Sequence, residues 1–309
     1  MAVAISPGKV ILLGEHGVLY GKPCLSVAIS LKVAVSIEKS NSFLVNGQPL
    51  DEKKHSYIEK AIKTLWKGKP LSITTFSQIP SASGLGSSAA ITVATVASLL
   101  ALKKSFDVKE VAKKSFEIEY EVQNGASPND TSICTYGNAI LVWEKEENGY
   151  IWRISKGGKR WFIYPINAPD MQIVVGHTGI KSKTPMLIKK IKKFIEHSSF
   201  GKEIIEEIEC LVLEGRKMLS KGDLLKLGEI MNENHKLLHT MGASSKEIEK
   251  LINAALQAGA YGAKLTGAGG GGSIIAIGEK PEKIAETIEK KGGKAFIVSI
   301  EKEGVKVWG

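Results

Sequence analysis

A segment rich in glycine and serine, residues 79–90, has the composition of a phosphate-binding loop. It reads Ile-Pro-Ser-Ala-Ser-Gly-Leu-Gly-Ser-Ser-Ala-Ala and leads into an alanine-rich stretch that predicts a helix. Gly84 and Gly86 allow the backbone to approach a ligand closely, and the first free N–H groups of the helix would then face an anion. Ser87 and Ser88 add hydroxyls that can cap the helix, bind phosphate or ligate Mg²⁺. The alternative is a flexible turn before a well-capped helix.

Residues 7–23 place charged groups and a histidine at the two ends of a strongly apolar stretch. Lys9 stands at its beginning, and Glu15 and His16 follow it in a turn between two glycines. A lysine beside an apolar strand is usually typical of a solvent-facing edge. Polar groups within a tight glycine turn, by contrast, often contact a ligand.

A third segment, residues 264–276, holds five glycines between Lys264 and a β-branched run. Glycines in such a place carry an entropic cost and add no packing, so close approach of the backbone to another group explains them better than a hinge does. The pattern G-x-G-x-x-G at residues 267–272 lies too near the C-terminus to open a βαβ unit, and no GxxxxGK[ST] loop occurs in the chain.

Strands and helices surround these segments without an internal repeat. In the first half we expect strands at 3–5, 10–13, 25–37, 71–76 and 137–143, helices at 53–66, 89–102 and 108–120, and a hairpin at 144–161. In the second half we expect a strand at 171–175, a long helical zone at 185–241, helices at 246–258 and 282–291, and a closing strand at 295–300. A change in the sequence pattern near residue 165 predicts two domains, 1–165 and 166–309.

The composition narrows the class of protein. The chain has 309 residues, a net charge of +10 and 42 basic residues, of which three are arginine. Nucleic-acid readers usually rely on arginine, so the lysine excess indicates a solvated surface rather than nucleic-acid binding. Cys24, Cys134 and Cys210 form no CxxC pair, which favours a reducing compartment over disulfides or a zinc ribbon. With no signal-peptide pattern and no apolar run long enough to span a bilayer, we expect a soluble cytoplasmic protein without a membrane partner.

Taken together and in order, the three segments resemble the signatures of the GHMP small-molecule kinases, and residues 7–23 resemble the mevalonate kinase branch in particular. The resemblance implies an α+β fold of two domains, the first like domain 2 of ribosomal protein S5 and the second ferredoxin-like, with the active site in the cleft between them. It also implies that ATP, with Mg²⁺, phosphorylates the C5 hydroxyl of mevalonate in isoprenoid synthesis. Phosphomevalonate and the other hydroxyl of mevalonate stay open as alternative acceptors.

A fourth segment, residues 118–131, is similar to the family's ExxxxxG-Ala-Ser-Pro-x-Asp region. By this resemblance Asp130 is the catalytic aspartate, and Glu119 holds Mg²⁺ together with Ser88. Glu121 competes with Glu119 for the metal if the register slips by two. Such a ligand set is sensible, because Mg²⁺ takes few carboxylates besides phosphate oxygens.

Asp130 and Lys9 are the implied catalytic pair. Asp130 could accept the proton of the attacking alcohol, while Lys9 would lower the pKa of that alcohol and offset the charge that develops in the transition state. Sequence does not decide which of the two matters more. Glu15 and His16 resemble residues near the acceptor, so the mevalonate-binding residues are Lys9, Glu15, His16 and Asp130.

The resemblance also gives the nucleotide site. The residues implied in ATP binding are Pro80, Ser81, Ala82, Ser83, Gly84, Leu85, Gly86, Ser87, Ser88, Ala89 and Ala90, and those backing the phosphate loop are Gly267, Ala268, Gly269 and Gly270. Two functions of other classes are alternatives: a non-catalytic relative that senses a metabolite, and an RNA-binding protein, which the few arginines and aromatics disfavour. Assembly as a homodimer is possible.

Overall fold

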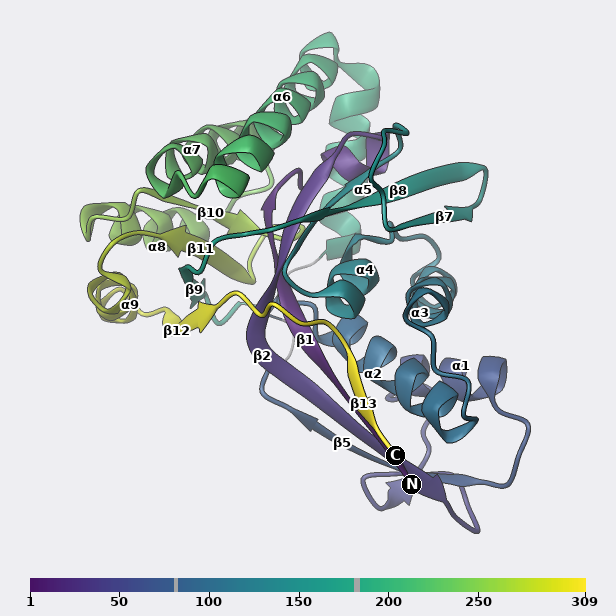
Figure 1. Cartoon of the computed structure of the whole chain (residues 1–309). Coiled ribbons are helices and arrows are strands. Elements are labelled where there is room, and N and C mark those ends of the chain that lie inside the picture. The colour runs from purple at the N-terminus through teal and green to yellow at the C-terminus, as the bar shows by residue number, and fades with distance from the viewer. Residues whose placement is uncertain (81–82, 181–183) are drawn as a thin grey trace.

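The computed structural model of the chain describes residues 1–80, 83–180 and 184–309. In these residues, strands gather in two sheets, and helices pack against each of them (Figure 1). The sequence prediction of a mixed α and β fold is therefore confirmed, and the details below concern the elements that position the site.

Two long antiparallel strands, β1 and β2, form the centre of the first sheet. Its strands are β1 (Ala2–Leu13), β2 (Cys24–Lys39), β3 (Leu44–Val45), β4 (Gln48–Pro49), β5 (Leu71–Ser77), β6 (Ala139–Trp143), β7 (Trp152–Lys156), β8 (Lys159–Ile166) and β13 (Lys306–Trp308). The predicted strands 3–5 and 10–13 join into one, because the pairing of β1 with β2 continues across a register shift between Pro7 and Gly8. Gly8 has no room for a side chain, since an added Cβ would lie 3.0 Å from the carbonyl oxygen of Leu85.

Four helices of the first half cover one region of this sheet (Figure 1). They are α1 (Ser56–Leu65), α2 (Ser87–Leu102), α3 (Val108–Gln123) and α4 (Asn129–Tyr136), and a short 3₁₀ turn, η1 (Gly17–Tyr20), follows β1. Helix α2 is apolar on all sides because it packs on β1 and β2 as well as on the other three helices. This burial fixes the direction in which the N-terminus of α2 points.

The second sheet has the strand order β10-β11-β9-β12 and is antiparallel throughout its described residues. Its strands are β9 (Gln172–His177), β10 (Gly262–Thr266), β11 (Ser273–Ile277) and β12 (Lys294–Ser299). The helices of this half are α5 (Thr184–His197), α6 (Ser199–Lys221), α7 (Leu224–Thr240), α8 (Lys246–Gln257) and α9 (Pro281–Lys290). The helical zone predicted at 185–241 divides because Ser198 and Asp223 each cap a new helix.

The end of the chain returns to its beginning. Strand β13, which the sequence analysis does not predict, pairs with β1, so the two termini lie side by side (Figure 1). The division into domains 1–165 and 166–309 stays a prediction; β8 ends at Ile166 and β9 begins at Gln172. Among the described residues, no helix has the length and apolar character needed to cross a bilayer.

Candidate active site

Lys9 and Asp130 form an ion pair beside a cavity of about 850 Å³. Lys9, in β1, exposes 3% of its surface, and its Nζ lies 2.8 Å from Oδ2 of Asp130, in the first turn of α4. Burial alone would lower the pKa of Lys9, but the attraction of Asp130 outweighs it and raises this pKa. Lys9 is therefore a fixed cation next to a carboxylate.

A hydrogen-bond chain orients Asp130 from the other side. The hydroxyl of Ser26 donates to Oδ1 of Asn129 over 2.9 Å, and Nδ2 of Asn129 donates to Oδ1 of Asp130 over 2.9 Å. The N-terminus of α4 adds partial positive charge near the same carboxylate. Sequence reasoning missed both the helix and Asn129; the proline at position 128, with an acidic residue two positions later, is the signal that indicates a helix start here.

Glu119, not Glu121, faces this site. Glu119 is buried on α3, where Gln123 donates to its Oε1 over 3.1 Å while Oε2 is buried without a partner. Burial, and next the charge of Asp130, raise the pKa of Glu119 to about 8. Glu121 lies on the exposed side of the helix and pairs with Lys60 over 2.7 Å.

Tyr57 of α1 connects the two predicted metal ligands. Its hydroxyl accepts a hydrogen bond from Nε2 of Gln123 over 3.2 Å and also contacts Ser88. Because Gln123 holds Glu119 as well, Ser88 and Glu119 border the same space. A hydroxyl beside a buried carboxylate oxygen that lacks a partner is a donor set that fits Mg²⁺. Tyr57 lines the cavity and was not predicted.

The glycine- and serine-rich loop enters α2 as the sequence suggests. Gly84 and Gly86 have φ values of +80° and +78°, and Gly86 precedes the first residue of the helix. An added Cβ at Gly86 would lie 2.6 Å from Cγ of Lys9, so this position requires glycine for space as well as for conformation. The loop thus passes directly over the lysine of the ion pair.

The predicted ATP-binding residues divide into three groups. Five of them line the cavity: Ser83, Gly84, Gly86, Ser87 and Ser88. The side chains of Leu85, Ala89 and Ala90 are buried in the core, and Pro80 is half-buried beside the loop. Ser81 and Ala82 lie outside the described residues.

The third glycine-rich segment backs the loop. Ser273 donates a hydrogen bond to the carbonyl of Ser83 over 2.7 Å. Gly267 and Ala268 line the cavity, whereas the backbone N–H of Gly270 donates to the carbonyl of Ala243 over 2.8 Å. Gly269 packs against the same carbonyl, which an added Cβ would meet at 2.0 Å. Of the predicted support residues, Gly267 and Ala268 therefore line the cavity, and Gly269 and Gly270 contact the turn behind it.

Glu15 is part of a buried ion pair with Lys264 that sequence reasoning missed. Lys264, in β10, is fully buried and donates to Oε1 of Glu15, while Oε2 of Glu15 has no partner. Burial raises the pKa of Glu15 and lowers that of Lys264, and their mutual attraction opposes both shifts. The sequence feature that could have indicated this pair is the single lysine, Lys264, at the start of a glycine-rich motif.

His16 is a neutral hydrogen-bond donor. Its Nε2 donates to the carbonyl of Ala268 over 3.1 Å, across the two halves of the chain. Burial lowers its pKa to about 4. The residue has a φ of +63°, which places its ring in the turn between β1 and η1.

These groups surround one cavity of about 850 Å³. A neighbouring cavity of about 500 Å³ shares His16, Val18, Leu19 and Ile188 with it. The first is lined by Lys9, Ile11, Glu15, His16, Val18, Leu19, Lys54, Tyr57, Ser83, Gly84, Gly86, Ser87, Ser88, Ile91, Asp130, Ile188, Gly267 and Ala268. A helix N-terminus, a fixed cation and two carboxylates converging on one space can bind a polyphosphate and an alcohol together.

Residues 56–138 match the GHMP kinases N terminal domain, and residues 216–294 match the GHMP kinases C terminal family. The chain belongs to the GHMP kinase family. Both matched regions contribute to the cavity, the first through Tyr57, the glycine- and serine-rich loop and Asp130, and the second through Gly267 and Ala268. The sequence prediction of this family is confirmed.

Relatives of this GHMP kinase match over nearly its full length. It is 33% identical to a mevalonate kinase of Pyrococcus abyssi, covering 99% of this chain and 98% of the relative, and 33% identical to one of Methanothermobacter thermautotrophicus, covering 88% and 89%. Among solved structures, the L. major mevalonate kinase in complex with R-mevalonate aligns with a TM-score of 0.82 at 26% identity, covering 97% of this chain and 96% of that chain. A Streptococcus pneumoniae phosphomevalonate kinase, at 20% identity and a TM-score of 0.80, shares the fold over 97% of this chain and 100% of its own.

Proposed function

We propose that this GHMP kinase is a mevalonate kinase, which transfers the γ-phosphate of ATP to the C5 hydroxyl of (R)-mevalonate and forms 5-phosphomevalonate. The observation that carries this proposal is the near full-length similarity to mevalonate kinases at about a third identity. The cavity at Lys9 and Asp130 supports it, because it offers an anion-binding helix end next to a carboxylate suited to an alcohol.

Asp130 and Lys9 act on the acceptor. Phosphoryl transfer depends on positioning and on neutralising charge rather than on covalent chemistry by the protein. The carboxylate of Asp130, held by Lys9 and Asn129, accepts the proton of the attacking hydroxyl. The ammonium of Lys9 stabilises the negative charge that grows on the same oxygen. The pair therefore works as one unit.

The phosphate chain of ATP lies along the Ser83–Ser88 loop in this proposal. The free N–H groups at the start of α2 bind phosphate oxygens, and the helix dipole adds to this attraction. Ser88 and the free oxygen of Glu119 would hold Mg²⁺, which, when bound, neutralises phosphate charge. Gly267 and Ala268 line the same cavity as this loop.

Glu15 and His16 position the acceptor. Glu15 keeps one oxygen on Lys264 and leaves the other unpaired, so this oxygen can accept a hydrogen bond from a substrate hydroxyl. His16 remains neutral at physiological pH and adds no charge next to it. We also propose a cytoplasmic enzyme, since the cysteines are free thiols. A homodimer stays a prediction.

The proposal is tested by offering purified enzyme with ATP and Mg²⁺ three acceptors: (R)-mevalonate, 5-phosphomevalonate and galactose. We expect ADP release with mevalonate alone, and ³¹P and ¹³C NMR of the product should place the phosphate on C5. Turnover of phosphomevalonate instead, or a phosphate on the C3 oxygen, would replace the proposed reaction with that of another GHMP kinase. Absence of turnover with every acceptor would favour a non-catalytic relative.

A further inference from the structure

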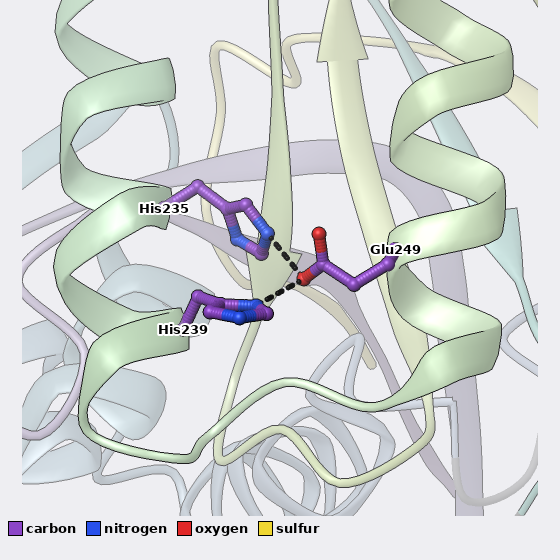
Figure 2. Close-up of side chains that lie close together, drawn as sticks. All are labelled: His235, His239 and Glu249. Carbon is purple, nitrogen blue, oxygen red and sulfur yellow. Dashed lines mark hydrogen bonds and ion pairs between the residues drawn. The ribbon is translucent and has the colours of Figure 1, made fainter.

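Two histidines and a glutamate meet on the second half of the molecule, apart from the residues that line the cavity (Figure 2). His235 and His239 are one turn apart on α7, so their rings point from the same face of that helix. Glu249 reaches them from α8. Its Oε1 lies 2.9 Å from Nε2 of His235 and 3.0 Å from Nδ1 of His239, and all three atoms lie within 4.8 Å of one another.

The three groups are of the kinds that a transition-metal ion binds. Two imidazole nitrogens and the hydroxyl of Ser244 gather at Oε1 of Glu249. The cluster therefore presents two imidazoles and one carboxylate. Lys264, whose charge acts on His235, is already paired with Glu15.

The surroundings also suit coordination. Ser244 donates a hydrogen bond to Oε1 of Glu249, which orients the carboxylate in the way that groups around a metal's ligands usually do. The other nitrogen of His235 lies 3.5 Å from the backbone nitrogen of Leu265, at the limit of hydrogen bonding. The N–H of Leu265 donates to this nitrogen, and at that length the contact is weak and hardly restrains the ring. The side chains of His239 and Glu249 are 60% and 31% exposed, so an ion can enter from solvent.

We propose that His235, His239 and Glu249 bind a divalent transition-metal ion, with Zn²⁺ as its prototype. Two imidazoles and one carboxylate are a ligand set for zinc, whereas Mg²⁺ prefers oxygen ligands alone. Tetrahedral bonds of about 2.0–2.1 Å place ligand atoms about 3.3 Å apart, so small side-chain movements admit the ion. Water fills the fourth position on the exposed side.

Such an ion would join α7 to α8 across the turn at residues 241–245. That turn supports the third glycine-rich segment, because the carbonyl of Ala243 accepts the N–H of Gly270 over 2.8 Å. The metal would thus stabilise a support of the phosphate loop without touching the substrates. Its role is structural, and it is independent of the reaction proposed above.

The experiment uses full-length protein freed of metal by a chelator and kept in millimolar Mg²⁺, which occupies oxygen-rich sites. Co²⁺ is titrated as a spectroscopic probe, and Zn²⁺ then competes with it. We expect one Co²⁺ per chain, visible absorption bands of tetrahedral intensity, and displacement by Zn²⁺. His239→Ala and Glu249→Gln should each weaken binding by more than about tenfold, and Ser244→Ala by about tenfold. Zn²⁺ should raise the melting temperature of the wild type and leave that of His239→Ala unchanged.

Two variants serve as matched controls. His197 is an exposed histidine on α5, and Cys210 is an exposed thiol that could capture metal by itself. His197→Ala and Cys210→Ser should bind Co²⁺ like the wild type. The proposal is overturned if the wild type shows no saturable binding at micromolar Co²⁺ or Zn²⁺, or if His239→Ala and Glu249→Gln bind as tightly as it does.

Discussion

Asp130 and Lys9, the proposed catalytic pair, are held by partners that leave them little freedom. Asp130 has one oxygen on Lys9 and the other on Asn129, and Asn129 is itself fixed by Ser26. Such a carboxylate does not need to reorganise when an alcohol arrives, and this preorganisation is the main source of electrostatic catalysis. The contribution of each residue is therefore open to test by single changes.

Asp130→Asn should lower kcat by about 10²–10⁴-fold, because the amide keeps the shape of the side chain but cannot accept the proton. Steady-state kinetics with mevalonate and ATP measure the effect, and circular dichroism checks the fold. The matched control is Glu121→Gln, which alters an exposed carboxylate on α3. A kcat for Asp130→Asn within threefold of the control would remove Asp130 from the mechanism.

Lys264→Met should reduce the free energy of unfolding by about 3–5 kcal/mol, because it leaves the carboxylate of Glu15 buried without a partner. The double variant Glu15→Gln/Lys264→Met should recover most of this loss, since it removes both charges. Urea unfolding measures each value. Lys22→Met, which breaks more exposed pairs with Glu206 and Glu209, should cost less than about 1 kcal/mol for each pair. Equal stability of the single and double variants would contradict the argument.

At the scale of elements, prediction from sequence succeeded where local chemistry decides the structure. The loop before α2 was predictable because positive φ angles at Gly84 and Gly86 need glycine. The helix α4 was missed because its eight residues have no apolar periodicity to support the start signal at Pro128. The pair of Glu15 with Lys264 joins residues 249 positions apart, which no local pattern reveals.

Gly86→Ala should disable the loop for two reasons: its φ of +78° strains any side chain, and the new Cβ would meet Lys9 at 2.6 Å. We expect a loss of about 1–3 kcal/mol in stability and a raised KM for ATP, because Lys9 must move. Gly149→Ala separates the two causes, since Gly149 has a φ of +93° and open space around it. Its effect on stability should be smaller, with the KM for ATP unchanged. A raised KM in both variants would refute the role of the Lys9 contact.

At the scale of the whole molecule, the two halves of the chain are joined at the cavity itself. Thr266 exchanges hydrogen bonds with the backbone of Ile11, and Ser273 binds the carbonyl of Ser83. These contacts come from β10 and β11 in the second sheet and reach β1 and the loop before α2 in the first half. The proposed active site therefore forms only when both halves are docked, and a change that weakens the docking also disrupts the site.

His16 makes this docking sensitive to acid. Its pKa falls from 6.5 to about 4 on folding, so the unfolded chain binds a proton more readily than the folded one. The resulting stability is complete above pH 6.5 and is lost as the pH falls toward 4; by pH 5 the loss is about 2 kcal/mol. Urea unfolding at pH 7.5 and 5.0 measures it in the wild type and in His16→Gln, which can still donate to Ala268 but does not titrate. Glu119, with a pKa of about 8, titrates in both proteins and cancels in the comparison. Parallel losses in the two proteins would mean that another group carries the acid sensitivity, whereas a smaller loss in His16→Gln places it at the contact between the halves.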